Sequence, residues 1–355
     1  MFQPSKKTIE MLEDIEQRID PETEEQFAQA WHAFSYDQFD GDLFCPCRKK
    51  LSTPSIDMPR ININDTLTDY DLLLQSQLCA ASNALSTHHL TLGLWTYYGT
   101  GLLSSVLGAE IFTAPRELNT DPITRSLGST DAIREMVERG LPDLDTGFGK
   151  RLFECGEIFA EVFSKYPKIS KYVSVYHPDL QGPLDICELL WGGDMFYAMY
   201  DEPELVHAAL SLITETFTAM LRRWRKIFPS TEEMSTYKFY HHRGGVTLRC
   251  DSATNLSPTL YREFAMPYDA LLYKRFGGGA MHFCGKGDHY IEALSETPGL
   301  YAINMSQPHL NDMETIYRNT VDKGIKILGL GRAEALRALE TREKGLCHNV
   351  SSFLS

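Results

Sequence analysis

GGGAMHFCGKGDHY, at residues 277–290, places a short apolar segment between two glycine-rich turns. Residues 279–284 have the length and composition of a buried strand, and the glycines before them end a preceding helix. Residues 285–287 form the loop after this strand, and Asp288 can cap the next helix. The stretch therefore predicts a strand that feeds directly into a helix.

Similar units follow one another along the chain. Further strand-like runs lie at residues 172–176, 245–249, 301–305 and 325–330. Between residues 245 and 330 strands and helices alternate, and repeated βα units of this length imply a parallel sheet. We therefore expect an α/β protein, specifically a (β/α)8 TIM barrel, with a doubly wound open sheet as the alternative.

Two helices have clear boundaries in the sequence. Residues 202–228 carry one apolar stripe, with Asp201 as a cap and Pro203 in the first turn. A second helix begins at Ser257 and should kink near Pro267. Polar helical segments dominate the start of the chain. We expect an N-terminal helical extension over residues 1–60 and the barrel over residues 61–355.

Composition excludes several classes of function. The 355 residues include 34 Lys and Arg against 48 Asp and Glu, which gives a formal net charge of −14. Nucleic-acid surfaces are built from clustered basic residues, so we expect no nucleic-acid partner. No apolar run approaches the roughly 18–20 residues that cross a bilayer, so we expect no membrane association. The 8 cysteines are thinly spread, which favours a reducing cytoplasmic location.

Two side chains in the opening stretch can hold a metal. His282 and Cys284 are two residues apart in the strand, so both point to the same face near its carboxyl end. In a barrel that end carries the active site. An imidazole and a thiolate form half of a tetrahedral zinc site, although two buried core residues are the alternative interpretation. Cys347 and Cys250 are the candidates for a further ligand.

Polar residues also follow two other strands. Asp251 comes just after the strand at 245–249, where a carboxylate can orient a ligand, transfer protons or bind a metal. Asp179 lies in the loop after residues 172–176 and is the second catalytic candidate. The candidates for substrate binding are His177, Gln181, His241 and Arg243.

Three motifs, in this order, resemble the uroporphyrinogen decarboxylase superfamily over roughly residues 60–355. They are DLQGPLDICELLWGG (179–193) followed by DEPELVHAAL, then DSATNLSPTLYREFAMPY (251–268), and then the glycine-rich stretch quoted first. The resemblance implies a (β/α)8 barrel. It also implies one of two chemistries, decarboxylation of a tetrapyrrole without a cofactor or methyl transfer that depends on zinc and a corrinoid.

The sequence is closer to the methyltransferase branch. The arginine-rich motif of true decarboxylases, similar to RQAGRY, is absent from the comparable segment, MPRININDTLTDYDLLLQSQL. The corrinoid- or cobalamin-dependent methyltransferases bind zinc through a His-x-Cys pair and a later Cys, so the resemblance implies His282 and Cys284 as ligands. For the third ligand, Cys347 in a shifted position, Cys250 and Asp251 or a nearby carboxylate are the alternatives, and a metal-free site is a further one. The family places its last ligand in a Gly-Cys turn, where this chain has Ser351 and Ser352.

Three functions follow as hypotheses. The first is a zinc-dependent methyltransferase that moves a methyl group between a corrinoid and a thiol or other small acceptor. The second is a decarboxylase of a tetrapyrrole or another carboxylated substrate. The third is a non-catalytic protein that binds a corrinoid or tetrapyrrole. We expect a small-molecule substrate, with a corrinoid protein and a second copy of the chain as candidate partners.

Overall fold

The computed structural model describes residues 2–230, 232–342 and 350–352, and it is a mixed α/β structure with parallel sheets. Five parallel strands form the central sheet in the order β11-β10-β9-β8-β7. Their bounds are Val246–Arg249 (β7), Gly279–Phe283 (β8), Leu300–Met305 (β9), Lys326–Leu330 (β10) and Val350–Ser352 (β11). The strands expected between residues 245 and 330 are therefore confirmed, together with their parallel direction.

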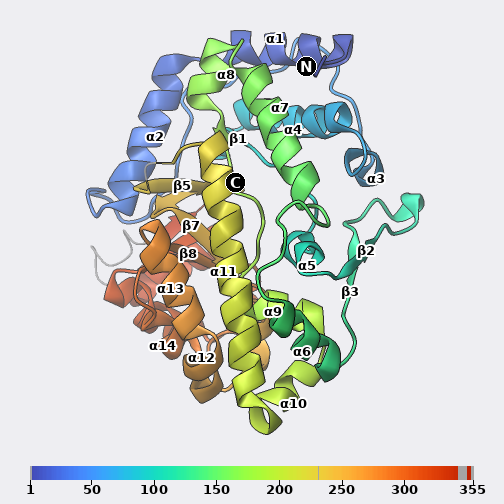
Figure 1. Cartoon of the computed structure of the whole chain (residues 1–355). Helices are drawn as coiled ribbons and strands as arrows, with labels where there is room; N and C mark the ends of the chain where they lie inside the picture. Colours follow the sequence, from blue (N-terminus) through green and yellow to red (C-terminus); the bar gives the residue numbers. More distant parts are fainter. Residues whose placement is uncertain (1, 231, 343–349, 353–355) are drawn as a thin grey trace.

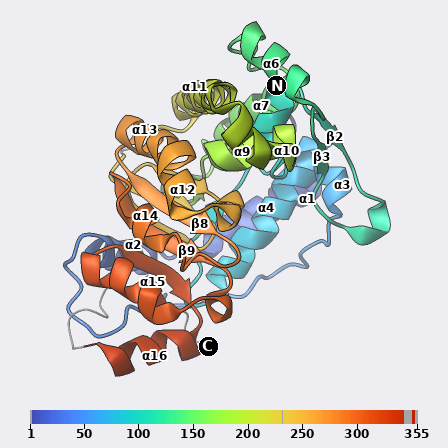
Figure 2. The same cartoon turned by 90° about the horizontal axis from the view of Figure 1, so that it is seen from below.

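Helices connect these strands, and Figure 2 shows α12 to α15 around β8 and β9. Their bounds are Pro258–Phe264 (α12), Met266–Phe276 (α13), Ile291–Ser295 (α14), Met313–Asn319 (α15) and Arg332–Thr341 (α16). Ser257 caps α12, since its hydroxyl accepts the backbone N–H of Leu260 at 3.3 Å. The helix breaks before Pro267, which lies in the first turn of α13 and confirms the expected kink.

The longest helix of the described chain, α11 (Pro203–Ile227), confirms the helix expected at residues 202–228 (Figure 1). Its apolar stripe is buried, with Ile213 and Phe217 fully covered. Pro203 occupies the first turn as expected. The capping position is taken by Glu202 rather than Asp201, and no side chain caps the helix.

A second parallel pair, β1 (Gly93–Leu94) and β4 (Ser174–Val175), forms a separate two-stranded sheet. The chain after β4 runs along β7, where the Nε2 atom of His177 accepts the backbone N–H of Thr247 at 2.9 Å. Between β1 and β4 the chain forms an antiparallel arm, β2 (Glu110–Phe112) and β3 (Ile123–Arg125), which extends outward in Figure 1. The described strands form one five-stranded and three two-stranded sheets and do not close into a barrel. The α/β class is confirmed and the TIM barrel is not.

An antiparallel hairpin covers one face of the central sheet. Its strands are β5 (Met234–Tyr237) and β6 (Tyr240–Arg243). Tyr240 shares a buried cluster with small and aliphatic side chains of β8, β9 and β10 and with the aromatic side chains of α2 (Pro21–Ser35). His241 and Arg243, two of the candidates for substrate binding, lie in β6, which pairs along its whole length with β5.

The N-terminal helices belong to the main core. α1 (Lys6–Arg18) packs on α4 (Tyr70–Leu85) and on α8 (Pro167–Tyr172). Met11, Leu12 and Ile15 of α1 are fully buried in the largest hydrophobic cluster. The expected N-terminal helices are therefore present, and they pack directly against residues after position 60.

The remaining helices surround this core. Their bounds are Ile63–Thr66 (α3), Leu102–Val106 (α5), Thr130–Arg139 (α6), Gly149–Phe163 (α7), Pro183–Trp191 (α9) and Asp194–Asp201 (α10). Within the described residues, short 3-10 turns lie at Arg116–Leu118, Ser252–Asn255, Pro308–Leu310 and Val321–Lys323. Among the helices in the described ranges, none is long and apolar enough to cross a membrane.

A buried arginine joins the N-terminal segment to α4. The Arg48 side chain is fully buried, and its Nε atom donates to Glu24 at 2.6 Å. Its guanidinium also donates to the backbone oxygens of Ala84, Thr87 and Leu90 at 2.6–3.0 Å. One guanidinium therefore pairs with a buried carboxylate and also hydrogen-bonds to backbone oxygens at the end of α4 and just after it.

Replacing this cation should destabilise the protein strongly. We expect Arg48→Ala to lower the free energy of unfolding by about 3–5 kcal/mol, because Glu24 would remain buried without a partner. Urea denaturation measures the loss. Lys50→Ala removes the exposed Lys50–Asp20 pair and should cost much less. Equal losses in the two variants would contradict the central role of Arg48.

Candidate metal centre

Three potential metal ligands meet where β7 and β8 end. Asp251 follows β7, while His282 belongs to β8 and Cys284 comes directly after it. One ligand atom from each of the three side chains lies within 4.8 Å of the other two. The Cys284 Sγ atom lies 3.5 Å from Nε2 of His282, and the Cys284 backbone N–H donates to Oδ1 of Asp251 at 2.7 Å. His282 and Cys284 thus face the same site, as the strand alternation predicts.

The imidazole of His282 is held in one orientation. Its Nδ1 atom lies 2.6 Å from Oδ1 of Asn304, and the Asn304 amide group donates to the backbone oxygen of Leu328 at 2.7 Å. Because an amide oxygen only accepts, Nδ1 carries the ring proton and Nε2 keeps a lone pair toward Cys284. Burial lowers the pKa of His282, which favours this neutral form. Metal-binding histidines are commonly oriented by such a contact.

The thiol of Cys284 is less ready to ionise than a free cysteine. Burial raises the pKa of the Cys284 thiol, and the nearby Asp251 carboxylate raises it further. The hydroxyl of Ser306 lies 3.3 Å from the sulfur. A bound cation would favour the thiolate, since metal ligation requires loss of the thiol proton.

The donor set fits zinc. Thiolate, imidazole and carboxylate are all zinc ligands, and a sulfur and a nitrogen on one tetrahedral zinc stand about 3.5 Å apart. The Sγ–Nε2 separation of 3.5 Å matches that spacing. Three protein ligands leave one position for water or substrate, as in catalytic zinc sites. Cys347, one of the candidates for the third ligand, lies outside the described residues, and Cys250 is not a member of this cluster.

Asp179 and Gln181, two other residues predicted for the site, are linked to the cluster by Arg249. The Arg249 guanidinium pairs with Oδ2 of Asp179 at 3.0 Å and lies 3.6 Å from Oδ2 of Asp251. The second Asp179 oxygen accepts the Gln181 amide group at 2.6 Å. Both oxygens of the buried Asp179 therefore have partners, and this carboxylate holds Arg249 beside the candidate metal site.

A wall of aromatic side chains with one lysine was not predicted from the sequence. Tyr237 lies with its ring centre 6.3 Å from that of His282. The Lys238 ammonium lies 5.5 Å from the Tyr237 ring centre and 5.7 Å from that of Trp95, on which Tyr97 stacks. Burial lowers the pKa of Lys238. In the sequence, the run of aromatic residues after β1 and the lysine in the hairpin turn were the features that could have indicated this wall.

Three predicted substrate-binding residues lie elsewhere. Both ring nitrogens of His177 are used within the protein, by the backbone oxygen of Pro178 and the N–H of Thr247. His241 packs against the edge of Trp31. Arg243 stacks on Tyr301 at 4.0 Å, near the start of β9 and away from the strand ends. The structure does not bring these three residues to the cluster.

A buried carboxyl, also missed, positions Asp251. Asp185 accepts the backbone N–H groups of Asp251 and Ser252 at 3.0 and 2.8 Å and the Ser252 hydroxyl at 2.7 Å. Burial, together with the Asp251 charge, raises the pKa of Asp185 to about 7. The turn that carries Asp251 is therefore anchored from α9.

Comparisons with known proteins assign no family. No family model matches the chain, and no curated protein matches it. The candidate site therefore rests on the geometry of its own residues.

Removing the partner of the histidine should weaken metal binding. We expect Asn304→Ala to lower zinc affinity about 10- to 100-fold, because the His282 ring loses the contact that orients it. Competition with a chromophoric chelator measures the affinity. Asn319→Ala, which removes only a bond to Thr315 on α15, should leave it unchanged. Equal affinities in both variants would show that Asn304 does not orient a ligand.

A second buried carboxyl makes stability depend on pH. Asp269 is fully buried, with the Tyr261 hydroxyl at 3.4 Å, and burial together with Asp185 raises the pKa of Asp269 well above its ordinary value. The native state therefore keeps a proton that the unfolded state loses above about pH 4. Stability falls as pH rises through this window, by at most about 1.4 kcal/mol per pH unit for this group.

Asp269→Asn should remove that dependence. The free energy of unfolding of the variant, relative to the natural protein, should increase with pH from about pH 4 up to the native pKa. Urea titrations at several pH values test this. Asp312→Asn is the control of opposite sign, because hydrogen bonding to Thr315 lowers the pKa of Asp312. A difference for Asp269→Asn that stays constant with pH would contradict the assignment.

Proposed function

We propose that the chain is a zinc-dependent methyltransferase that moves a methyl group between a corrinoid and a thiol or another small acceptor. The observation that carries the proposal is the convergence of Asp251, His282 and Cys284 at one sheet edge. The motif resemblance supports the reaction class. The proposal includes a cytoplasmic enzyme with a (β/α)8 barrel fold and a corrinoid protein as partner.

Each residue has a distinct role in this proposal. Asp251, His282 and Cys284 hold the zinc ion, Asn304 orients the imidazole and Asp185 fixes the turn of Asp251. Bound zinc supplies a Lewis acid that keeps an acceptor thiol ionised as the nucleophile. Arg249 and Lys238 add positive charge beside the acceptor. Trp95 and Tyr237 give the site an apolar wall that limits its contact with water.

Zinc analysis and a methyl-transfer assay test the proposal. Purified protein should contain about one equivalent of zinc and should transfer methyl from methylcobalamin to 2-mercaptoethanol. His282→Ala and Cys284→Ala should each lose the zinc and the activity. Cys79→Ala, which removes a thiol that donates to the Pro59 backbone oxygen and is not in the cluster, should keep both.

Two results would contradict it. One is zinc below roughly half an equivalent in the natural protein, with no change in the ligand variants. The other is turnover of uroporphyrinogen that a chelator does not affect, which is the behaviour of the alternative decarboxylase. A comparison of Asp251→Ala with Cys347→Ala shows which of these side chains completes the ligand set.

A further inference from the structure

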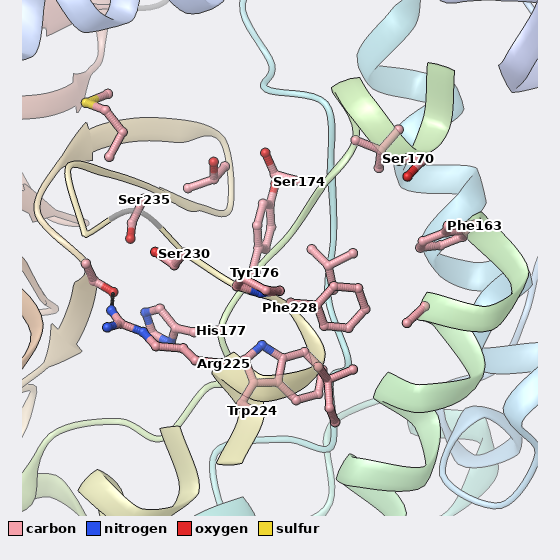
Figure 3. Close-up of a pocket in the computed structure, with 18 of the residues that line it drawn as sticks. Phe163, Ser170, Ser174, Tyr176, His177, Trp224, Arg225, Phe228, Ser230 and Ser235 are labelled. Atoms are coloured by element: carbon pink, nitrogen blue, oxygen red, sulfur yellow. Dashed lines mark hydrogen bonds between the residues drawn. The ribbon is translucent and has the colours of Figure 1, made fainter. Parts of the chain in front are cut away.

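A separate cavity of about 530 Å³ lies at the opposite end of the strands from the metal cluster. Its wall includes Gly245, which precedes β7, whereas Asp251 follows that strand. The wall also includes β4 with the two residues after it, side chains of α7 and α8, the last turn of α11, and residues 228–230 and 234–236 (Figure 3). In α/β folds this end of the strands is the one that does not carry the catalytic residues. The cavity is therefore distinct from the proposed zinc site.

The size and lining of the cavity fit a small molecule. Ligand sites typically enclose about 300–1,000 Å³ and combine apolar walls with a few polar groups. Here the apolar part includes Phe163, Val173, Trp224 and Phe228. Serine hydroxyls interrupt this surface, and Figure 3 shows them on several sides of it. A ring-sized apolar group can lie against the partly exposed Phe228, whose ring centre is 5.2 Å from that of the buried Trp224.

One hydrogen-bond donor opens onto this cavity. Trp224 is only 1% exposed, and its six-membered ring packs against Gly156 of α7, where a Cβ atom would lie 2.6 Å from Cζ3. The indole nitrogen is on the opposite edge and points toward the cavity in Figure 3. No described residue accepts a hydrogen bond from it. The indole N–H therefore opens onto the cavity, where a ligand can supply the acceptor that the described residues do not.

The charge of the wall indicates what kind of acceptor fits. Arg225 is the one charged side chain among the described residues that line the cavity, because burial keeps His177 neutral by lowering its pKa. The guanidinium donates to the backbone oxygen of Gly245 at 3.0 Å and pairs with Glu232, whose own side chain is half exposed and outside the wall. A guanidinium carries five N–H donors, so it can bind a further acceptor.

We propose that this cavity binds a small aromatic carboxylate. Its ring would lie against Phe228, and its carboxylate would accept the indole N–H of Trp224 and face the Arg225 cation. The site is independent of zinc and of the proposed methyl transfer.

Benzoate and benzamide are the two probes that test the proposal, since they share a shape and differ in charge. We expect saturable benzoate binding, measured by NMR titration, and weaker binding of benzamide. Trp224→Phe keeps the ring and removes the N–H, so it should weaken benzoate about three- to tenfold. Ser235→Leu should block the cavity and abolish binding. Cys284→Ala and removal of metal by a chelator should leave the benzoate affinity unchanged.

Three results would overturn the proposal. The first is no saturable benzoate binding up to about 10 mM, in which case water alone serves the indole N–H. The second is equal affinity for benzoate and benzamide. The third is a benzoate affinity that neither Trp224→Phe nor Ser235→Leu changes, which would place the ligand elsewhere. Circular dichroism of both variants shows that a loss of binding does not come from unfolding.

Discussion

The parallel register of β7, β8 and β9 is the constraint on which the candidate site depends. Arg249 of β7 pairs with His282 of β8, and His282 pairs with Asn304 of β9. This single row brings together a potential ligand, the residue that orients it and the cation beside it. A slip of one residue would turn His282 to the other face of the sheet and separate it from the site. The hydrogen-bonded ladder therefore determines the chemistry at its end.

The hairpin of β5 and β6 packs closely on one face of the central sheet, which we call the inner face. Tyr240 lies directly against Gly329 of β10, where any side chain would collide with its ring. Gly329 also has a φ of +71°, a conformation that favours glycine. The same hairpin carries Tyr237 and Lys238 to the carboxyl ends of the strands. The hairpin that covers the inner face therefore also supplies part of the wall of the candidate metal centre.

Sequence patterns predicted the parts of the structure that depend on local signals. Short apolar runs marked β7 to β10, Pro203 marked a helix start, and Pro267 marked the kink between α12 and α13. The alternation of side chains placed His282 beside Cys284. The hairpin was missed because its strand residues are mostly polar and its turn uses Lys238 at φ +51° rather than glycine. Asn304 and Asp185 were missed because their roles come from strand register and tertiary packing, which no short motif encodes.

The central claim is that this sheet edge binds zinc through one thiolate and one imidazole. X-ray absorption at the zinc edge of the purified, zinc-loaded protein tests this claim most directly. The account predicts one sulfur at about 2.3 Å together with nitrogen and oxygen ligands at about 2.0–2.2 Å that include an imidazole. Cys284→Ala should remove the sulfur shell. Zinc surrounded by oxygen alone, or a sulfur shell that persists in both Cys284→Ala and Cys347→Ala, would contradict the account.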